Sequence, residues 1–89
     1  MTQKERWKKM DFTDRIKAIG AEVKRAEIWE KKNEEIYKSA LARGLELIEL
    51  SLDDPTDKEE IYPMLVLKEK LAEFYVGEKR NVANLFAII

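Results

Sequence analysis

The sequence predicts an all-α protein, a small three-helix bundle, and three observations lead to that fold class. Apolar residues recur every three or four positions over most of the 89-residue chain. Charged residues make up 39% of it and hydrophobic residues 45%, as in amphipathic helices around one core. Glycine and proline, which interrupt helices, number only three and two. We expect helices at about 12–31, 34–52 and 57–76 and a short C-terminal helix at about 81–89.

The first helix is predicted from a stripe of apolar residues with helical spacing: Phe12, Ile16, Ile19, Val23, Ala26 and Trp29. Asp11 or Thr13 can cap its start, and Asp14 suits the first turn. Gly20 weakens the helix by ~1 kcal/mol relative to alanine, unless another helix packs closely against it.

The polar run E-K-K-N-E-E at residues 30–35 decides whether the first two helices are separate. Lysines 31 and 32 suit a helix end, Asn33 is a good N-cap, and glutamates 34 and 35 suit a first turn. One continuous helix over 12–52 is the alternative, because the run lacks glycine and proline. Such a helix would be ~60 Å long against ~30 Å for the third, leaving Ile16, Ile19 and Val23 uncovered. We therefore favour the break.

The second helix carries the widest apolar face, so we expect it to be the most buried segment of the protein. Its stripe comprises Ile36, Tyr37, Ala40, Leu41, Gly44, Leu45, Ile48 and Leu52, with Leu47 and Leu50 widening it. Trp29 and Tyr37, on either side of the polar run, are expected to be core or interface anchors.

The acidic stretch S-L-D-D-P-T-D-K-E-E, residues 51–60, is interpreted as the boundary between two helices. Pro55 ends the preceding helix, and Thr56 with Glu59 matches a capping box. A calcium-binding loop starting at Asp53 would need glycine where Lys58 stands and glutamate where Met64 stands. We therefore predict no metal site here.

The third helix should carry a stripe formed by Ile61, Met64, Leu65, Leu71, Phe74 and Tyr75. Pro63 is expected to kink it by removing a hydrogen bond to Glu59. Gly77 is expected to stop it. Val82, Leu85, Phe86, Ile88 and Ile89 give the last segment an amphipathic pattern, with Asn81 as its cap.

Composition argues against several function classes. Histidine and cysteine are absent, which removes the usual general base, the commonest zinc ligands and disulfide bonds. The N-terminal residues lack the apolar run of a signal peptide, and no apolar run is long enough to cross a membrane. Interspersed lysines and glutamates argue against binding to a membrane surface. We expect a cytoplasmic protein that is not an enzyme, and we assign no catalytic, cofactor-binding or metal-binding residue.

Charge is distributed unevenly along the chain. Residues 1–10 hold four basic residues against one acid, a net of +3, and residues 46–60 hold seven acids against one lysine, a net of −6. We expect residues 1–10 to be a basic flexible arm and residues 11–89 a single helical domain. Residues 46–60, here called the acidic bend, could bind a basic partner or the basic arm of a second copy.

The basic arm supports one alternative function, binding of nucleic acid. Trp7 stands among Lys4, Arg6, Lys8 and Lys9, a combination that can stack on a base and neutralise phosphates. The competing interpretation is a solvated tail with Trp7 folded onto the first helix. In that case deleting residues 1–9 should cost little stability.

A second alternative is an enzyme that uses carboxylate-bound Mg²⁺ on a phosphate substrate. Glu46 and Glu49 lie three residues apart, and Glu69 and Glu73 four residues apart on the next helix. This arrangement resembles the helical nucleotide pyrophosphohydrolases of the MazG type, which pair two acidic helix motifs. The likeness covers four residues: the leading acidic pair is absent because Leu45 precedes Glu46, and the second pair is spaced differently.

The function predicted by elimination is a small helical protein-interaction module that forms a homodimer or docks on a protein partner. Ile16, Ile19 and Val23, with Gly20 between them, are the expected flat contact face. The apolar tail, which includes Leu85 and Phe86, is expected to add surface that three short helices can hardly bury. The sequence names no process and no partner.

Overall fold

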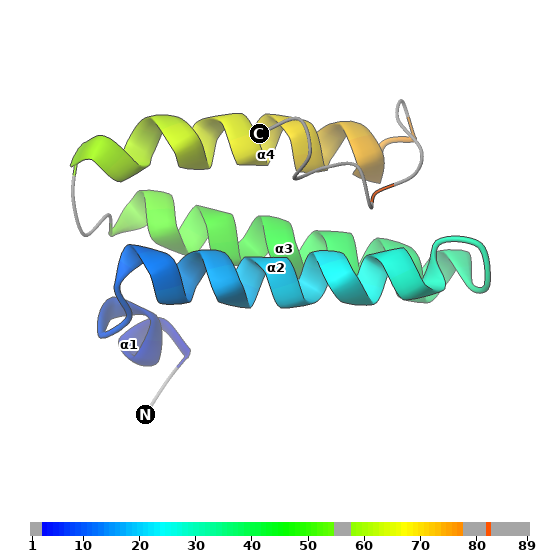
Figure 1. Cartoon of the computed structure of the whole chain (residues 1–89), viewed down its shortest axis with the longest axis horizontal. Coiled ribbons are helices and arrows are strands. Elements are labelled where there is room, and N and C mark those ends of the chain that lie inside the picture. Colours follow the sequence, from blue (N-terminus) through cyan, green and yellow to red (C-terminus); the bar gives the residue numbers. More distant parts are fainter. Residues whose placement is uncertain (1–2, 55–57, 78–81, 83–89) are drawn as a thin grey trace.

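A computed structural model describes residues 3–54, 58–77 and 82, and these contain helices and turns only (Figure 1). The elements are α1 (Gln3–Lys8), α2 (Phe12–Trp29), α3 (Glu34–Asp53), the short 3-10 helix η1 (Lys58–Glu60) and α4 (Ile61–Tyr75). The predicted all-α bundle is confirmed. The predicted C-terminal helix at 81–89 lies outside the described residues, apart from Val82.

The three long helices run antiparallel to their neighbours in the chain, and α3 is the central one (Figure 1). Both α2 and α4 pack extensively against α3. α3 is the helix with the most buried residues, as the sequence predicted: Tyr37, Ala40, Leu41, Gly44, Leu47, Ile48 and Ser51. The core also contains Ile19, Val23 and Ala26 from α2 and Met64, Leu67, Leu71 and Phe74 from α4.

The break between the first two helices is confirmed. Asn33 has an extended backbone, and its side-chain oxygen accepts a hydrogen bond from the Ile36 amide at 3.1 Å. The amides of Lys32 and Asn33 donate to the Trp29 carbonyl, which closes α2 just before the turn. A single helix over 12–52 is thereby excluded. α2 is capped at its start by Asp11, whose carboxylate accepts from the Asp14 amide at 2.9 Å.

The prediction of a kink at Pro63 is wrong. The chain enters this helix through η1, and the α-helix begins only at Ile61. Pro63 therefore lies in the first turn, where an amide has no partner within the helix and its loss costs little. The helix ends as predicted near Gly77, which has a φ of 88° and donates to the Phe74 carbonyl. Residues 55–57, which include half of the predicted capping box, lie outside the described residues.

The glycine at a close helix contact is Gly44, not Gly20. A Cβ atom added at Gly44 would lie 2.9 Å from Leu71 Cδ2, so α3 and α4 approach closely there. A Cβ added at Gly20 would meet nothing within 4 Å. The expected close-approach face on the first helix is therefore absent at Gly20.

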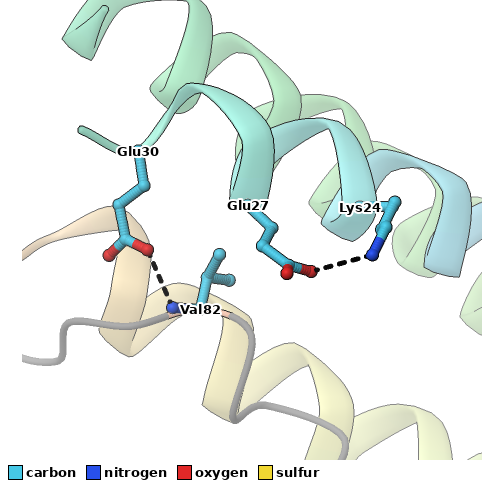
Figure 2. A network of polar contacts seen from close by, with 4 residues as sticks. All are labelled: Lys24, Glu27, Glu30 and Val82. Atoms are coloured by element: carbon cyan, nitrogen blue, oxygen red, sulfur yellow. Dashed lines mark hydrogen bonds and ion pairs between the residues drawn. The ribbon is translucent and has the colours of Figure 1, made fainter. Parts of the chain in front are cut away.

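One further contact ties the chain beyond α4 to the end of α2. The amide of Val82, a fully buried residue, donates to the Glu30 carboxylate at 3.0 Å (Figure 2). One helical turn earlier, Glu27 forms an exposed ion pair with Lys24 at 3.6 Å (Figure 2). Val82 thus contributes to the core from outside the three long helices.

Candidate functional site

The surface that the sequence indicated for self-association is buried within the chain. Ile19 is fully buried and Val23 nearly so, and both belong to the core, while Ile16 is partly buried against it. The expectation that this face contacts a second copy is wrong for Ile19 and Val23. A break at Asn33 lets α3 fold back along α2 and cover them.

The N-terminal segment is a helix packed on the bundle, in contrast to the flexible arm that the sequence predicted. Trp7 is 4% exposed, and its indole Nε1 donates to the Ser51 hydroxyl at 2.8 Å. Ser51 in turn donates to the Leu47 carbonyl at 3.1 Å. The ring of Trp7 is therefore almost fully buried, and too little of it is exposed for a base to stack on.

Arg15 of α2 bonds to the same region, where α1 contacts the C-terminal part of α3. Its guanidinium is fully buried, donates to the carbonyls of Asp54 at 2.7 Å and Trp7 at 3.0 Å, and lies 5.7 Å from the Trp7 ring centroid. The Asp54 carbonyl belongs to the C-terminal end of α3, where a cation is favoured by the helix dipole. The N-terminal helix thus contacts the C-terminal part of α3 in its own chain, through Trp7 and Ser51.

The sequence interpretation missed Arg15 because an arginine among polar residues is normally exposed. One indication was present: Arg15 stands next to Ile16 and four residues before Ile19, at the edge of the apolar stripe of α2. Helical spacing alone does not tell a buried arginine from a flanking one, because the carbonyls that hold it come from distant residues.

The four glutamates of the pyrophosphohydrolase alternative do not form a metal site in this structure. Glu46 pairs with Arg43 at 3.1 Å, and Glu49 pairs with Lys68 of α4. Within residues 3–54, 58–77 and 82, no three acidic residues come close enough together to hold a metal ion.

Two adjoining hollows lie along α2 and α3 and share Glu22 and Arg43. The first, of about 340 Å³, is lined by Trp7, Met10 and Leu47 among others, and the second has a volume of about 560 Å³. Four of the charged lining residues form ion pairs, Arg25 with Glu22 at 3.0 Å and Arg43 with Glu46, and Arg6 also lines the first hollow. The second hollow, whose charged lining residues all belong to these two pairs, offers little electrostatic attraction to a charged ligand.

The clearest candidate surface is the outer face of α4, here called the α4 stripe: Ile61, Tyr62, Leu65, Ala72, Tyr75 and Val76. Its most exposed side chains are Tyr62 at 77%, Val76 at 63% and Leu65 at 48%. The sequence interpretation placed Ile61, Leu65 and Tyr75 with Met64 on one buried stripe. The core takes Met64, Leu71 and Phe74 from that predicted stripe, together with Leu67, whereas Ile61, Leu65 and Tyr75 are exposed.

The α4 stripe exists because α4 is apolar on two sides. A helix with apolar residues around most of its circumference is normally covered on more than one side. Here α3 covers one side, and the other side remains open among the described residues. Several large apolar side chains on one exposed helix face are typical of a contact surface for another protein.

No protein-family model, curated protein or solved structure matches the chain. None of the helices in the described part of the chain is both long and apolar enough to cross a membrane. The fold and the α4 stripe therefore carry the functional argument alone.

Proposed function

We propose that this chain is a small helical protein-interaction module and that the α4 stripe is its contact face, with a second copy of the chain as partner. The observation that supports the proposal most directly is the exposure of Tyr62, Leu65 and Val76 on one side of a helix whose other side is in the core. Burying such side chains against another helix stabilises by about 25 cal/mol for each Å² of apolar surface removed from water.

The proposal moves the contact surface from α2 to α4 and keeps the predicted mode of interaction. Two features that suggested self-association from the sequence no longer support it. Ile19 and Val23 are already covered by α3, and the N-terminal helix is bonded to α3 of its own chain through Trp7 and Ser51.

The α4 stripe predicts a weak, reversible dimer. A 15-residue helix is only ~22 Å long, so a pair of such helices buries less surface than the roughly 1,200 Å² or more of a stable interface. We expect dissociation constants in the micromolar range or above, and a monomer at high dilution.

Nucleic-acid binding has less support than self-association, because Trp7 is enclosed and donates its indole hydrogen to Ser51. The pyrophosphohydrolase alternative is supported by no grouping of carboxylates in the described residues. We therefore retain the interaction module as the proposal.

The test is sedimentation equilibrium over a concentration series from about 10 to about 500 μM, the range that a small interface requires. The wild-type mass should rise with concentration toward twice the 10.5 kDa of the chain. Leu65→Glu should keep the mass at one chain while the far-UV circular dichroism stays helical. Lys70→Glu, at a half-buried charged position off the stripe on the same helix, is the matched control and should dimerise like wild type.

A wild-type protein that remains monomeric throughout the series would refute self-association. Ile19→Glu is not a suitable variant, since a charge at this fully buried position would unfold the monomer.

A further inference from the structure

We infer that two copies pair through antiparallel α4 helices, with a two-fold axis passing between Lys68 and Glu69. This inference rests on the proposed function and specifies the geometry of the partner. It follows from the order of the apolar stripe residues along α4, which is symmetric about that point; five of the six are exposed and Ala72 is half-buried.

The apolar residues of the α4 stripe occur in pairs at equal distances from the middle of the helix. Their positions are 61 and 76, 62 and 75, and 65 and 72, and each pair is centred between residues 68 and 69. When a helix is laid antiparallel on its own copy about that centre, each residue of the α4 stripe lies level with another residue of the stripe, and exposed Leu65 lies level with half-buried Ala72. At 100° per residue, Ile61, Leu65, Ala72 and Val76 fall within an arc of about 60°.

Side-chain size favours the antiparallel arrangement over the parallel one. Antiparallel helices place the large Leu65 opposite the small Ala72 of the other copy, twice, so the two layers are filled evenly. Parallel helices would place leucine opposite leucine and alanine opposite alanine, which overfills one layer and leaves a gap in the next.

The charges at the centre are also self-complementary. Lys68 and Glu69 of each copy lie at the axis, so four charges with a net of zero meet there. Lys68 forms an ion pair with Glu49 of its own chain, which holds it at the edge of the stripe. Glu69 is exposed, so a lysine from the other copy can approach it.

The absence of cysteine from the sequence allows a direct test by disulfide formation. Leu65→Cys and Ala72→Cys are prepared separately, mixed in equal amounts, oxidised, and the products weighed by mass spectrometry. We expect the mixed disulfide between positions 65 and 72 in about tenfold excess over either symmetric one, because facing positions alone meet the Cα separation a disulfide requires. In the antiparallel pair the two copies of position 65 are ~10 Å apart along the axis.

A symmetric disulfide between two copies of Leu65→Cys that forms as readily as the mixed one would overturn the antiparallel pairing. The outcome is separable from the proposed function. A monomeric wild type refutes the dimer itself, whereas a wild-type dimer with the wrong disulfide refutes only this geometry.

Charge reversal provides a second test that does not depend on cysteine. Lys68→Glu or Glu69→Lys alone would bring four like charges to the axis and should weaken the dimer by about tenfold in Kd. The double variant Lys68→Glu with Glu69→Lys restores two charges of each sign and should recover most of the wild-type affinity. Single reversals that leave Kd unchanged would refute a two-fold axis at this position. In all three variants circular dichroism should show an intact bundle.

Discussion

The Trp7 indole and the Ser51 hydroxyl are joined by a buried hydrogen bond of 2.8 Å although 44 positions separate them in the chain. Because the hydroxyl also donates to the Leu47 carbonyl, it is used as both donor and acceptor. Arg15 reaches the same corner and bonds the Trp7 carbonyl. The N-terminal helix is thereby a part of the folded core.

The first prediction is that Trp7→Ala lowers the free energy of unfolding by about 3–5 kcal/mol, the usual cost of truncating a buried tryptophan. Deleting residues 1–9 should destabilise at least as much, in contrast to the small effect expected of a solvated tail. Guanidinium denaturation followed by circular dichroism measures both. The expected loss is a large share of the stability of a domain of this size.

Lys8→Ala is the control within the same helix, because its side chain is exposed and should change stability by less than about 0.5 kcal/mol. A deletion variant as stable as wild type would show that α1 is only loosely attached.

The second prediction concerns a matched pair of glycines in α2 and α3. Gly20→Ala should stabilise by about 0.5–1 kcal/mol, since alanine favours the helix and the added methyl group meets no atom within 4 Å. Gly44→Ala should destabilise by about 1 kcal/mol net, because the methyl group would lie 2.9 Å from the fully buried Leu71 side chain. Thermal unfolding of the two variants should shift in opposite directions.

Equal shifts of the same sign would show that Leu71 moves aside at no cost. In that case the change in the free energy of unfolding for Gly44→Ala combined with Leu71→Ala should equal the sum of the two single changes. A true clash between the added methyl group and Leu71 predicts instead that the two changes are not additive.

The fold class and the break between the first two helices were predictable because they depend on local chemistry. Helical spacing, the cap at Asn33 and the stop at Gly77 act within a few residues, and all three are confirmed. Pro63 was misjudged by one turn, because sequence spacing did not show that the chain would enter α4 through η1. Local patterns therefore locate a helix better than they locate its first residue.

The candidate surface was not predictable to the same degree. Whether Ile19 or Leu65 faces solvent depends on which sides of α2 and α4 contact α3, and both residues satisfy the same spacing rule. The apolar residues on two sides of α4 indicate two covered faces, but they do not say which face meets the core. The role of Arg15 likewise depends on carbonyls of residues far away in the chain.

The third prediction concerns the turn between α2 and α3. Asn33→Ala removes the side-chain oxygen that accepts from the Ile36 amide and should destabilise by about 1 kcal/mol. Asn33→Asp keeps an acceptor and adds a negative charge at a helix N-terminus, so it should retain wild-type stability or exceed it. Urea denaturation of both variants decides the matter, and equal losses in the two would contradict the capping role.

The fourth prediction is that millimolar Mg²⁺ or Ca²⁺ leaves the melting temperature nearly unchanged. An ion that binds only the folded chain must raise it, and no suitable group of carboxylates lies within the described residues. A rise of several degrees would revive the pyrophosphohydrolase alternative. Alanine variants of Glu46, Glu49, Glu69 and Glu73 should then abolish the rise.

Thr56→Ala, at a position outside the described residues, still tests the predicted cap and should lower the free energy of unfolding by about 1 kcal/mol.

The last prediction is that Arg15→Lys is more damaging than Arg15→Met. The guanidinium spans two carbonyls, those of Trp7 and Asp54, from one fully buried position, and its Nε has no hydrogen-bond partner. A lysine keeps the buried positive charge, but its compact ammonium group cannot reproduce the two diverging bonds. Buried charge without matching hydrogen bonds is costly, so we expect a loss of about 3 kcal/mol.

Methionine removes the charge and the unpartnered Nε together and fills similar space. It removes one donor from each of two carbonyls. The Trp7 carbonyl still accepts from the Met10 amide at 3.1 Å, and the Asp54 carbonyl, whose bond is only partly buried, can take water instead. We therefore expect a smaller loss of about 1–2 kcal/mol for Arg15→Met. Chemical denaturation of the two variants at equal protein concentration gives the comparison. If Arg15→Lys is the more stable of the two, this prediction is wrong. The stabilising factor would then be the positive charge itself, through its interaction with the Trp7 ring and the C-terminal end of α3, and not the geometry of the guanidinium.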